Sequence, residues 1–279
     1  MRLGGPVFEK CPDPAAWTAA VKRLGYRAAY CPLPPDAADD MVKAYEAAAK
    51  AADIVIAEVG AWSNPLDPDP AKAKAAIEKN TQCLALADRI GARCCVNIAG
   101  SRNPKTWHGP SAEDLTKPTF DAIVQTVRGF IDAVKPTRTF YTLECMQWAY
   151  PHTADDYVEL LRAIDRKQFA VHFDPVNMIW SPERYFHTGD IIRDFLAKLG
   201  PHIRSCHAKD TTMSDKLTLH VDEIRPGLGN LDYKTFLKEL SRLEPDVPLM
   251  IEHLKGPEEY AQAAEYIRGV AKEVGVQFY

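Results

Sequence analysis

The stretch Phe169-Ala-Val-His-Phe-Asp174-Pro-Val-Asn177 decides how the rest of the chain is interpreted. Its first five residues are β-prone, an acid follows them, and a proline then interrupts the run. Because alternate side chains of a strand point to the same face, His172 and Asp174 are expected to face the same way. The stretch therefore predicts a short strand that carries a titratable side chain at its carboxyl end.

Three other short hydrophobic runs have the same form, each ending in a titratable or metal-competent side chain. They are Phe140–Glu144, Ile203–Asp210 and Pro248–His253. The residues Glu144, Asp174, His207 and Glu252 are separated by 30, 33 and 45 positions, which is close to the repeat of one strand plus one helix. The spacing suggests that four consecutive strand ends converge on one site.

Strand-like and helix-like patterns alternate along the whole chain. In the first helix Trp17, Ala20, Val21 and Leu24 recur at i, i+3, i+4 and i+7, after the N-cap signal Asp13-Pro14. We count eight strand-then-helix units and find no composition break, so we expect a single domain over residues 1–279. The expected strands cover residues 2–8, 27–33, 53–59, 94–98, 140–144, 169–174, 203–210 and 248–252, and later helices are expected at 118–134, 191–199 and 257–274.

Eight such units in this length fit an α/β fold, the (β/α)8 TIM barrel, whose active site lies at the carboxyl ends of the strands. The alternative is an open, doubly wound parallel sheet. No glycine-rich phosphate-binding turn such as GxGxxG follows the first expected strand. The barrel is therefore the predicted architecture.

The composition excludes several classes of partner. At 46% hydrophobic and 26% charged residues, with a net charge of −4, the chain lacks the basic surface that nucleic acid requires. No apolar run approaches the roughly 20 residues that cross a bilayer, and the N-terminus lacks a signal-peptide pattern. Seven cysteines without a CxxC pair are typical of reduced thiols, so we expect a cytoplasmic protein. A homo-oligomer is compatible with these numbers.

The residues Glu144, Asp174, His207 and Glu252 offer three carboxylates and one imidazole. An oxygen-rich set of this kind suits Mn²⁺, Mg²⁺ or Co²⁺ better than a structural zinc site, which favours Cys and His. Any one of these residues could instead form an ordinary ion pair. Their shared position at successive strand ends favours one divalent metal site, with Mn²⁺ preferred and Mg²⁺, Co²⁺ or Zn²⁺ as alternatives.

The order of these motifs resembles the xylose isomerase-like TIM barrel family, which includes sugar and sugar-phosphate isomerases and epimerases, inosose dehydratases, hydroxypyruvate isomerases and endonuclease IV. The matching segments are Glu144, then Asp-Pro-x-Asn (174–177), His-x-Lys-Asp (207–210), Pro-Gly-x-Gly-x-x-Asp-Tyr (226–233) and Glu252. The resemblance implies that Glu144, Asp174, His207 and Glu252 bind one divalent cation. It also implies that the two glutamates transfer protons.

Two departures from the family pattern bear on the activity. Many members place a histidine where this chain has Asn177, and the ketose 3-epimerases carry a His-x-x-Glu-Asn-x-Arg type segment in place of His207-Ala-Lys-Asp. Both departures argue against a 3-epimerase without changing the metal ligands. The nuclease branch uses many histidines for a three-metal cluster and is rejected, because the chain has eight histidines in all and an acidic charge balance.

Such a site suits proton transfer next to a carbonyl group, through an enediolate. With Glu144 and Glu252 as bases the result is isomerisation or epimerisation of a small sugar. If His172 or Lys209 protonates a β-hydroxyl, the same intermediate loses water, as in a lyase or dehydratase acting on a keto-sugar, keto-inositol or 3-keto-glycoside. A non-catalytic sugar-binding barrel is the third alternative, and the intact ligand set argues against it.

Several further residues are candidates for binding a small carbohydrate substrate. The segment 99–117 has no periodicity and is long for a connection, so we expect it to cover the barrel mouth. Glu58 lies near the end of an expected strand and could also reach the site. The candidates for substrate binding are Asn177, Arg225, Trp107, His108 and Asn97.

Overall fold

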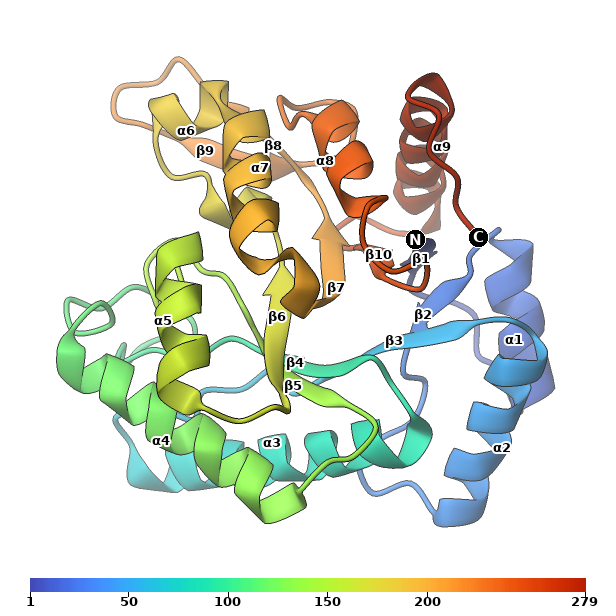
Figure 1. The fold of residues 1–279 in the computed structure, drawn as a ribbon, viewed down its shortest axis with the longest axis horizontal. Helices are drawn as coiled ribbons and strands as arrows, with labels where there is room; N and C mark the ends of the chain where they lie inside the picture. The colour runs from blue at the N-terminus through green and yellow to red at the C-terminus, as the bar shows by residue number, and fades with distance from the viewer.

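The computed structural model describes residues 1–279 and shows a closed barrel of eight parallel strands (Figure 1). The strands follow the order β1-β10-β7-β6-β5-β4-β3-β2 around the barrel. They are β1 (Arg2–Gly5), β2 (Ala28–Tyr30), β3 (Val55–Gly60), β4 (Cys94–Asn97), β5 (Phe140–Glu144), β6 (Phe169–Phe173), β7 (Ile203–Ala208) and β10 (Pro248–Ile251). The predicted single-domain TIM barrel is confirmed, and the open sheet is excluded.

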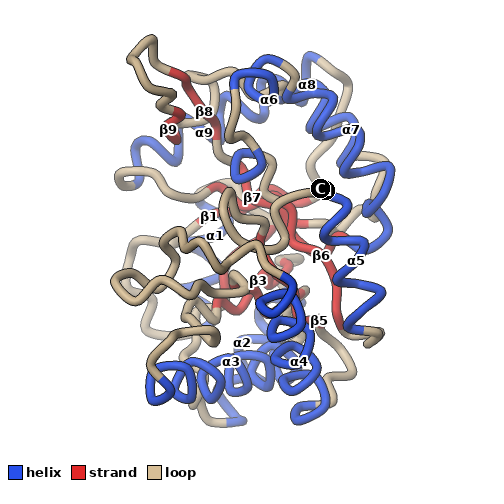
Figure 2. Tube along the Cα trace, turned by 90° about the vertical axis from the view of Figure 1, so that its left-hand side faces the viewer, coloured by secondary structure: helices blue, strands red, loops and turns tan.

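Helices connect the strands and form the outer layer of the molecule, with the strands inside (Figure 2). This arrangement follows from burial, because parallel strands that are apolar on both faces must be covered on the outside. The helices are α1 (Pro14–Arg23), α2 (Asp39–Ala51), α3 (Pro70–Ile90), α4 (Lys117–Val134), α5 (Ala154–Ile164), α6 (Pro182–Phe186), α7 (Thr188–Leu199), α8 (Tyr233–Leu240) and α9 (Pro257–Glu273).

Helix starts follow the local capping signals. The Asp13 side chain accepts a hydrogen bond from the backbone of Ala16 at the start of α1. At α5 the Thr153 side chain accepts from the Asp156 backbone, and the Asp156 carboxylate accepts from the Thr153 backbone, which makes a capping box. These contacts satisfy N–H groups that have no partner within the helix. They explain why helix positions could be predicted from the sequence.

The structure corrects several expected boundaries. Strand β1 ends at Gly5 rather than at residue 8, and β2 spans only Ala28–Tyr30, because strand length is set by pairing around the barrel. Helix α7 begins at Thr188 rather than at residue 191, and the five-residue helix α6 precedes it. Helix α6 does carry a start signal, since Ser181 caps it and Pro182 is its first residue.

An antiparallel hairpin, β8 (Asp210–Met213) and β9 (Val221–Ile224), follows β7 directly and was not predicted. It projects from the barrel at the upper left of Figure 1, and Figure 2 shows it at the edge of the molecule as well. Leu217 at its tip is fully exposed. The hairpin therefore adds a separate two-stranded sheet to the eight-stranded barrel.

Most of the buried apolar side chains form one continuous cluster of 62 residues that spans barrel and helices, and Ala28, Ala57 and Met250 form a small second cluster. All seven cysteines are free, and Cys83, Cys94, Cys95, Cys145 and Cys206 are buried. None of the helices is both long enough and apolar enough to cross a membrane.

Candidate metal centre and active site

The four predicted ligands meet at the carboxyl ends of four adjacent barrel strands. Glu144 is the last residue of β5, Asp174 directly follows β6, His207 lies near the end of β7, and Glu252 directly follows β10. One donor atom from each of the four lies within 4.8 Å of the others. The convergence expected from the spacing along the chain is present in three dimensions.

The His207 ring lies at the centre of this group. Its Nδ1 atom is 2.8 Å from Glu144 Oε1, 2.8 Å from Glu252 Oε1 and 3.8 Å from Asp174 Oδ2. Asp174 and His207 are completely buried. The Asp174 side chain is held by the turn after β6, since Oδ1 accepts from the backbone of Val176 at 2.9 Å. Its other oxygen, Oδ2, is thereby directed at the cluster.

Lys209 lies two residues after His207, just beyond the end of β7, and its side chain adds a positive charge to the cluster. Its Nζ atom lies 2.8 Å from Asp174 Oδ2, 2.8 Å from Glu252 Oε1 and 3.2 Å from Glu223 Oε1. Lys209 is only 2% exposed, so this ammonium group depends on the carboxylates for its stability. The lysine belongs to the cluster and is not a surface ion pair with Asp210.

The donor set fits a divalent cation. Asp174 Oδ2 and Glu252 Oε1 are buried, and neither has a hydrogen bond of acceptable geometry, although nitrogen atoms lie 2.8 Å away. Both oxygens pair with the Lys209 ammonium but lack a well-aligned donor, which leaves lone pairs that a cation could coordinate. Three carboxylates and one imidazole are donors that Mn²⁺, Mg²⁺ and related ions accept.

The charges in the cluster shift the pKa values of its members in different directions. Burial raises the pKa of Glu144 above its usual value, and the nearby Lys209 and His207 only partly offset this. Burial also opposes ionisation of Glu252, but the charges of His207 and Lys209 outweigh it and lower its pKa to about 2. The same balance, with Lys209 as the main stabilising charge, holds the pKa of Asp174 well below its usual range.

A cavity of about 420 Å³ opens above the cluster, a size suited to a small-molecule ligand. Glu144, Lys209 and Glu252 lie in its wall, whereas Asp174 and His207 are shielded beneath. The other lining residues are Trp62, Ile98, Trp107, His108, Met146, Gln147, Trp148, Asn177, Glu223 and His253. Three indole rings together with the charged side chains give the cavity both an apolar and a charged lining.

The segment 99–117 lies at this cavity, as its predicted role requires. Trp107 and His108 line the cavity, and the Trp148 Nε1–H donates to the carbonyl of His108 at 2.7 Å. The carboxylate of Asp114 orders the loop from within, because it accepts from Ser101 Oγ and from the Arg102 backbone. Asp114 itself is fully buried, so this loop has a small polar core of its own.

Three predicted site residues lie outside the cavity wall. Asn97 is fully buried, and its side-chain amide donates hydrogen bonds to the Ser63 carbonyl and to Asn80 Oδ1. These contacts hold the loop after β3 in place. Arg225 points along its own loop, where its closest hydrogen bond is to the Pro226 carbonyl at 3.5 Å. His172 lies one layer deeper in the barrel, with its Nε2 atom 3.0 Å from Glu58 Oε1. By contrast Asn177, Trp107 and His108 do line the cavity.

Some residues at the cavity could not be assigned from the sequence. Glu223 on β9 accepts from Lys209 Nζ at 3.2 Å, and its other oxygen lies 2.9 Å from His253 Nδ1. Gln147 Nε2 donates to Asn177 Oδ1 at 3.1 Å. Glu223 reaches the site only because the β8–β9 hairpin folds back beside it, and no periodic pattern marks that hairpin.

The segment Pro226–Tyr233 is organised around the carboxylate of Asp210. This side chain accepts hydrogen bonds from the backbones of Thr211, Gly227, Gly229 and Leu231 at 2.8–3.2 Å. A Cβ atom at Gly229 would collide with Asp210 Oδ1 and with the Thr211 carbonyl, which explains the glycine. The hydroxyl of Tyr233 then donates to the Lys209 carbonyl at 2.6 Å. The motif therefore fixes the backbone that carries Lys209.

We expect Asp210→Ala to lower the free energy of unfolding by about 2–4 kcal/mol, because four backbone N–H groups lose a charged acceptor. Urea unfolding in the presence of a chelator measures this without a contribution from metal. Asp222→Ala is the matched control, since Asp222 is exposed on the same hairpin and its carboxylate makes no hydrogen bond. Equal unfolding free energies for both variants would contradict the role given to Asp210.

Comparison with known proteins agrees with the barrel fold. The model of the xylose isomerase-like TIM barrel family matches residues 18–270. No curated protein matches the chain in sequence.

Solved structures share the fold at low sequence identity. D-Psicose 3-epimerase with D-tagatose from Clostridium cellulolyticum H10 is 17% identical, with a TM-score of 0.69 over 99% of this chain and 100% of that chain. The "probable 3-DHS dehydratase AsbF" from Bacillus anthracis is 14% identical, with a TM-score of 0.68 over 97% and 99%. A xylose isomerase-like TIM barrel protein from Mycobacterium smegmatis in complex with magnesium is 15% identical, with a TM-score of 0.67 over 98% and 97%. The family model covers most of the sequence, and the chain belongs to the xylose isomerase-like TIM barrel family.

Proposed function

We propose that this protein is a divalent-metal-dependent isomerase or epimerase acting on a small sugar or keto-sugar. The observation that carries the proposal is the group of donor atoms from Glu144, Asp174, His207 and Glu252, within 4.8 Å of one another at the floor of a cavity. A ligand set at the bottom of a cavity of this size leaves room for a small substrate above it. A sugar epimerase with the same fold supports this class of activity.

The proposed chemistry is proton transfer at the carbon beside a carbonyl group. A bound cation would polarise the carbonyl oxygen and stabilise the negative charge of the enediolate. Glu252 is the proposed base, because its side chain lines the cavity and its low pKa keeps the carboxylate ionised near neutral pH. Glu144 also lines the cavity, and its Oε1 atom contacts His207 Nδ1. It is the proposed group that returns a proton to the substrate.

The remaining cavity residues would bind and enclose the sugar. Asn177 and His108 offer polar groups to hydroxyls, and Trp107 offers an apolar face to the sugar ring. Because His172 is shielded from the cavity, Lys209 is the better proposed acid. We propose Mn²⁺ as the metal, with Mg²⁺, Co²⁺ and Zn²⁺ as alternatives, and a cytoplasmic protein, in keeping with its seven free cysteines.

The second candidate function is a lyase or dehydratase acting on a keto-sugar, keto-inositol or 3-keto-glycoside. The observation that favours it is the Lys209 ammonium, 2.8 Å from Glu252 Oε1 and in the cavity wall. A base and an acid so close together can remove a proton and protonate a leaving hydroxyl on the same substrate. The dehydratase with this fold supports the alternative.

An isotope experiment separates the two functions. Incubation with a panel of ketoses, keto-inositols and 3-keto-glycosides in D₂O should place deuterium at one carbon of the substrate or product. We expect a product of unchanged heavy-atom composition for an isomerase or epimerase, and one lighter by water or an alcohol for a lyase. Mass spectrometry detects both. Conversion without any deuterium incorporation would contradict the proposed proton transfer.

A further inference from the structure

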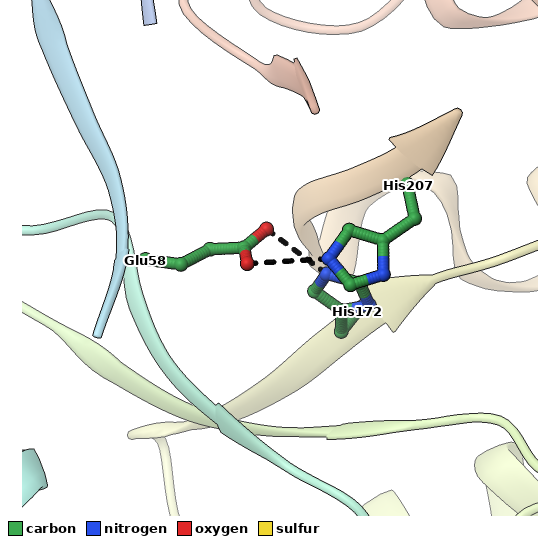
Figure 3. A group of neighbouring side chains, drawn as sticks. All are labelled: Glu58, His172 and His207. Carbon is green, nitrogen blue, oxygen red and sulfur yellow. Dashed lines mark hydrogen bonds and ion pairs between the residues drawn. The ribbon is translucent and has the colours of Figure 1, made fainter. Parts of the chain in front are cut away.

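A carboxylate outside the ligand set, Glu58, contacts the opposite nitrogen of the ligand histidine. Glu58 is 1% exposed and lies on β3, across the barrel from His207. Its Oε2 atom is 3.3 Å from His207 Nε2, and its Oε1 atom is 3.0 Å from His172 Nε2 (Figure 3). The hydroxyl of Ser205 also donates to Oε1. Glu58 does not line the cavity, so it cannot touch a substrate there.

This group occupies the barrel layer immediately below the proposed ligands. His172 and Ser205 each lie two residues before a ligand, Asp174 and His207, and therefore share their strand face. No lysine or arginine forms an ion pair with Glu58. A buried carboxylate in this position requires N–H or O–H donors at its oxygens.

The contacts of Glu58 define which nitrogen of His207 carries a proton. An ionised carboxylate only accepts hydrogen bonds, so the Nε2 atom facing it must be the N–H group. Three donors, on His172, His207 and Ser205, face the two oxygens of Glu58, an arrangement that suits the ionised carboxylate. With the proton on Nε2, a neutral ring has its lone pair on Nδ1, the atom directed at Glu144, Glu252 and Asp174.

We propose that Glu58 is a positioning residue, which holds His207 as an Nδ1 ligand by accepting the hydrogen bond of its Nε2–H group. The inference rests on the proposed metal site. Its physical basis is that a histidine ligand binds a cation more tightly when a carboxylate accepts from its other nitrogen, because the ring is oriented and its basicity rises. His172 donates to the other oxygen of Glu58 and holds the carboxylate in place.

The same three side chains could instead bind a second ion, since donor atoms of Glu58, His172 and His207 also lie within 4.8 Å of one another. The distances of 3.0 and 3.3 Å between nitrogen and oxygen are those of direct hydrogen bonds. An ion between these atoms would have to displace the proton on His207 Nε2. Direct hydrogen bonding is therefore the arrangement that the geometry favours.

Two measurements on the 279-residue chain test the proposal, with Zn²⁺ as a diamagnetic probe. Calorimetric titration should show one Zn²⁺ per chain in the wild type and an affinity about 10- to 100-fold weaker in Glu58→Gln. Ser205→Ala is the matched control, because it removes a hydrogen bond to the same carboxylate but leaves the Oε2 contact with His207 intact. We expect its Zn²⁺ affinity to remain close to that of the wild type.

The second measurement requires no variant and remains decisive if Glu58→Gln does not fold. In the ¹⁵N-histidine NMR spectrum of the Zn²⁺-loaded wild type, His207 should carry its proton on Nε2 and none on Nδ1. A proton on Nδ1, unchanged affinity in Glu58→Gln, equal weakening in Ser205→Ala, or two Zn²⁺ ions per chain would each overturn the proposal. A wild type that binds no Zn²⁺, Mn²⁺ or Mg²⁺ would instead overturn the proposed metal site itself.

Discussion

Replacement of Asp174 by asparagine should weaken the binding of Mn²⁺ by more than about 100-fold, since loss of a direct ligand should exceed the usual effect of losing an outer partner. The substitution is nearly isosteric, and the amide oxygen can still accept from the backbone of Val176, as Oδ1 does now. What disappears is the charge on Oδ2, the fully buried oxygen without a hydrogen bond. The fold should therefore persist while the ion is lost.

Thermal unfolding provides a readout that does not depend on the substrate. At a concentration of 100 times its Kd, the ion should stabilise the wild type by about 2.7 kcal/mol, and it should stabilise Asp174→Asn much less. Asp132→Asn makes the same chemical change at an exposed site, where Asp132 pairs with Arg166. If a folded Asp174→Asn protein still bound stoichiometric Mn²⁺ with the affinity of this control, the four-residue metal site would be wrong.

Replacement of Glu252 by glutamine should lower turnover by roughly 10²-fold or more, the usual scale for losing a positioned acid or base. Glu252 Oε1 lies 2.8 Å from both His207 Nδ1 and Lys209 Nζ, at the wall of the cavity. Those two neighbours lower its pKa to about 2, so the carboxylate is ionised near neutral pH and can accept a proton. A neutral amide cannot do this.

Loss of metal could mimic the effect of losing the base, so turnover must be compared at saturating Mn²⁺ with the bound ion measured. Glu258→Gln, at an exposed position in the first turn of α9, is the matched control. Glu144→Gln should be measured in parallel, because the proposal assigns a proton-transfer role to both glutamates. Full turnover in both metal-loaded variants would remove the glutamates from the chemistry and leave Lys209 as the remaining candidate.

The cluster of proposed ligands could be predicted because each of them is the polar end of a short apolar run. Glu144 and Asp174 lie at the carboxyl ends of β5 and β6, and such ends meet at one face of a barrel. The barrel itself could be predicted from the alternation of strand and helix patterns. Both inferences depend only on local sequence and on a general rule of the fold.

Other features depend on contacts between distant segments and leave no local pattern. Asn97 ends β4 as a site residue would, yet its amide bonds Ser63 and Asn80 because the loop after β3 folds across it. Glu58 differs from its apolar neighbours in β3, so the sequence marks it as unusual. Its partner could not be predicted, because the distance from Glu58 to His207 depends on the diameter and register of the whole barrel.

The pairing of β1 with β10 has a consequence for biosynthesis. Leu3 and Leu249 are partners in register, so the first strand has an unpaired edge until the last strand has left the ribosome. Glu252 directly follows that last strand. A nascent chain therefore lacks both a closed barrel and the full set of proposed metal donors until Glu252 has left the ribosome.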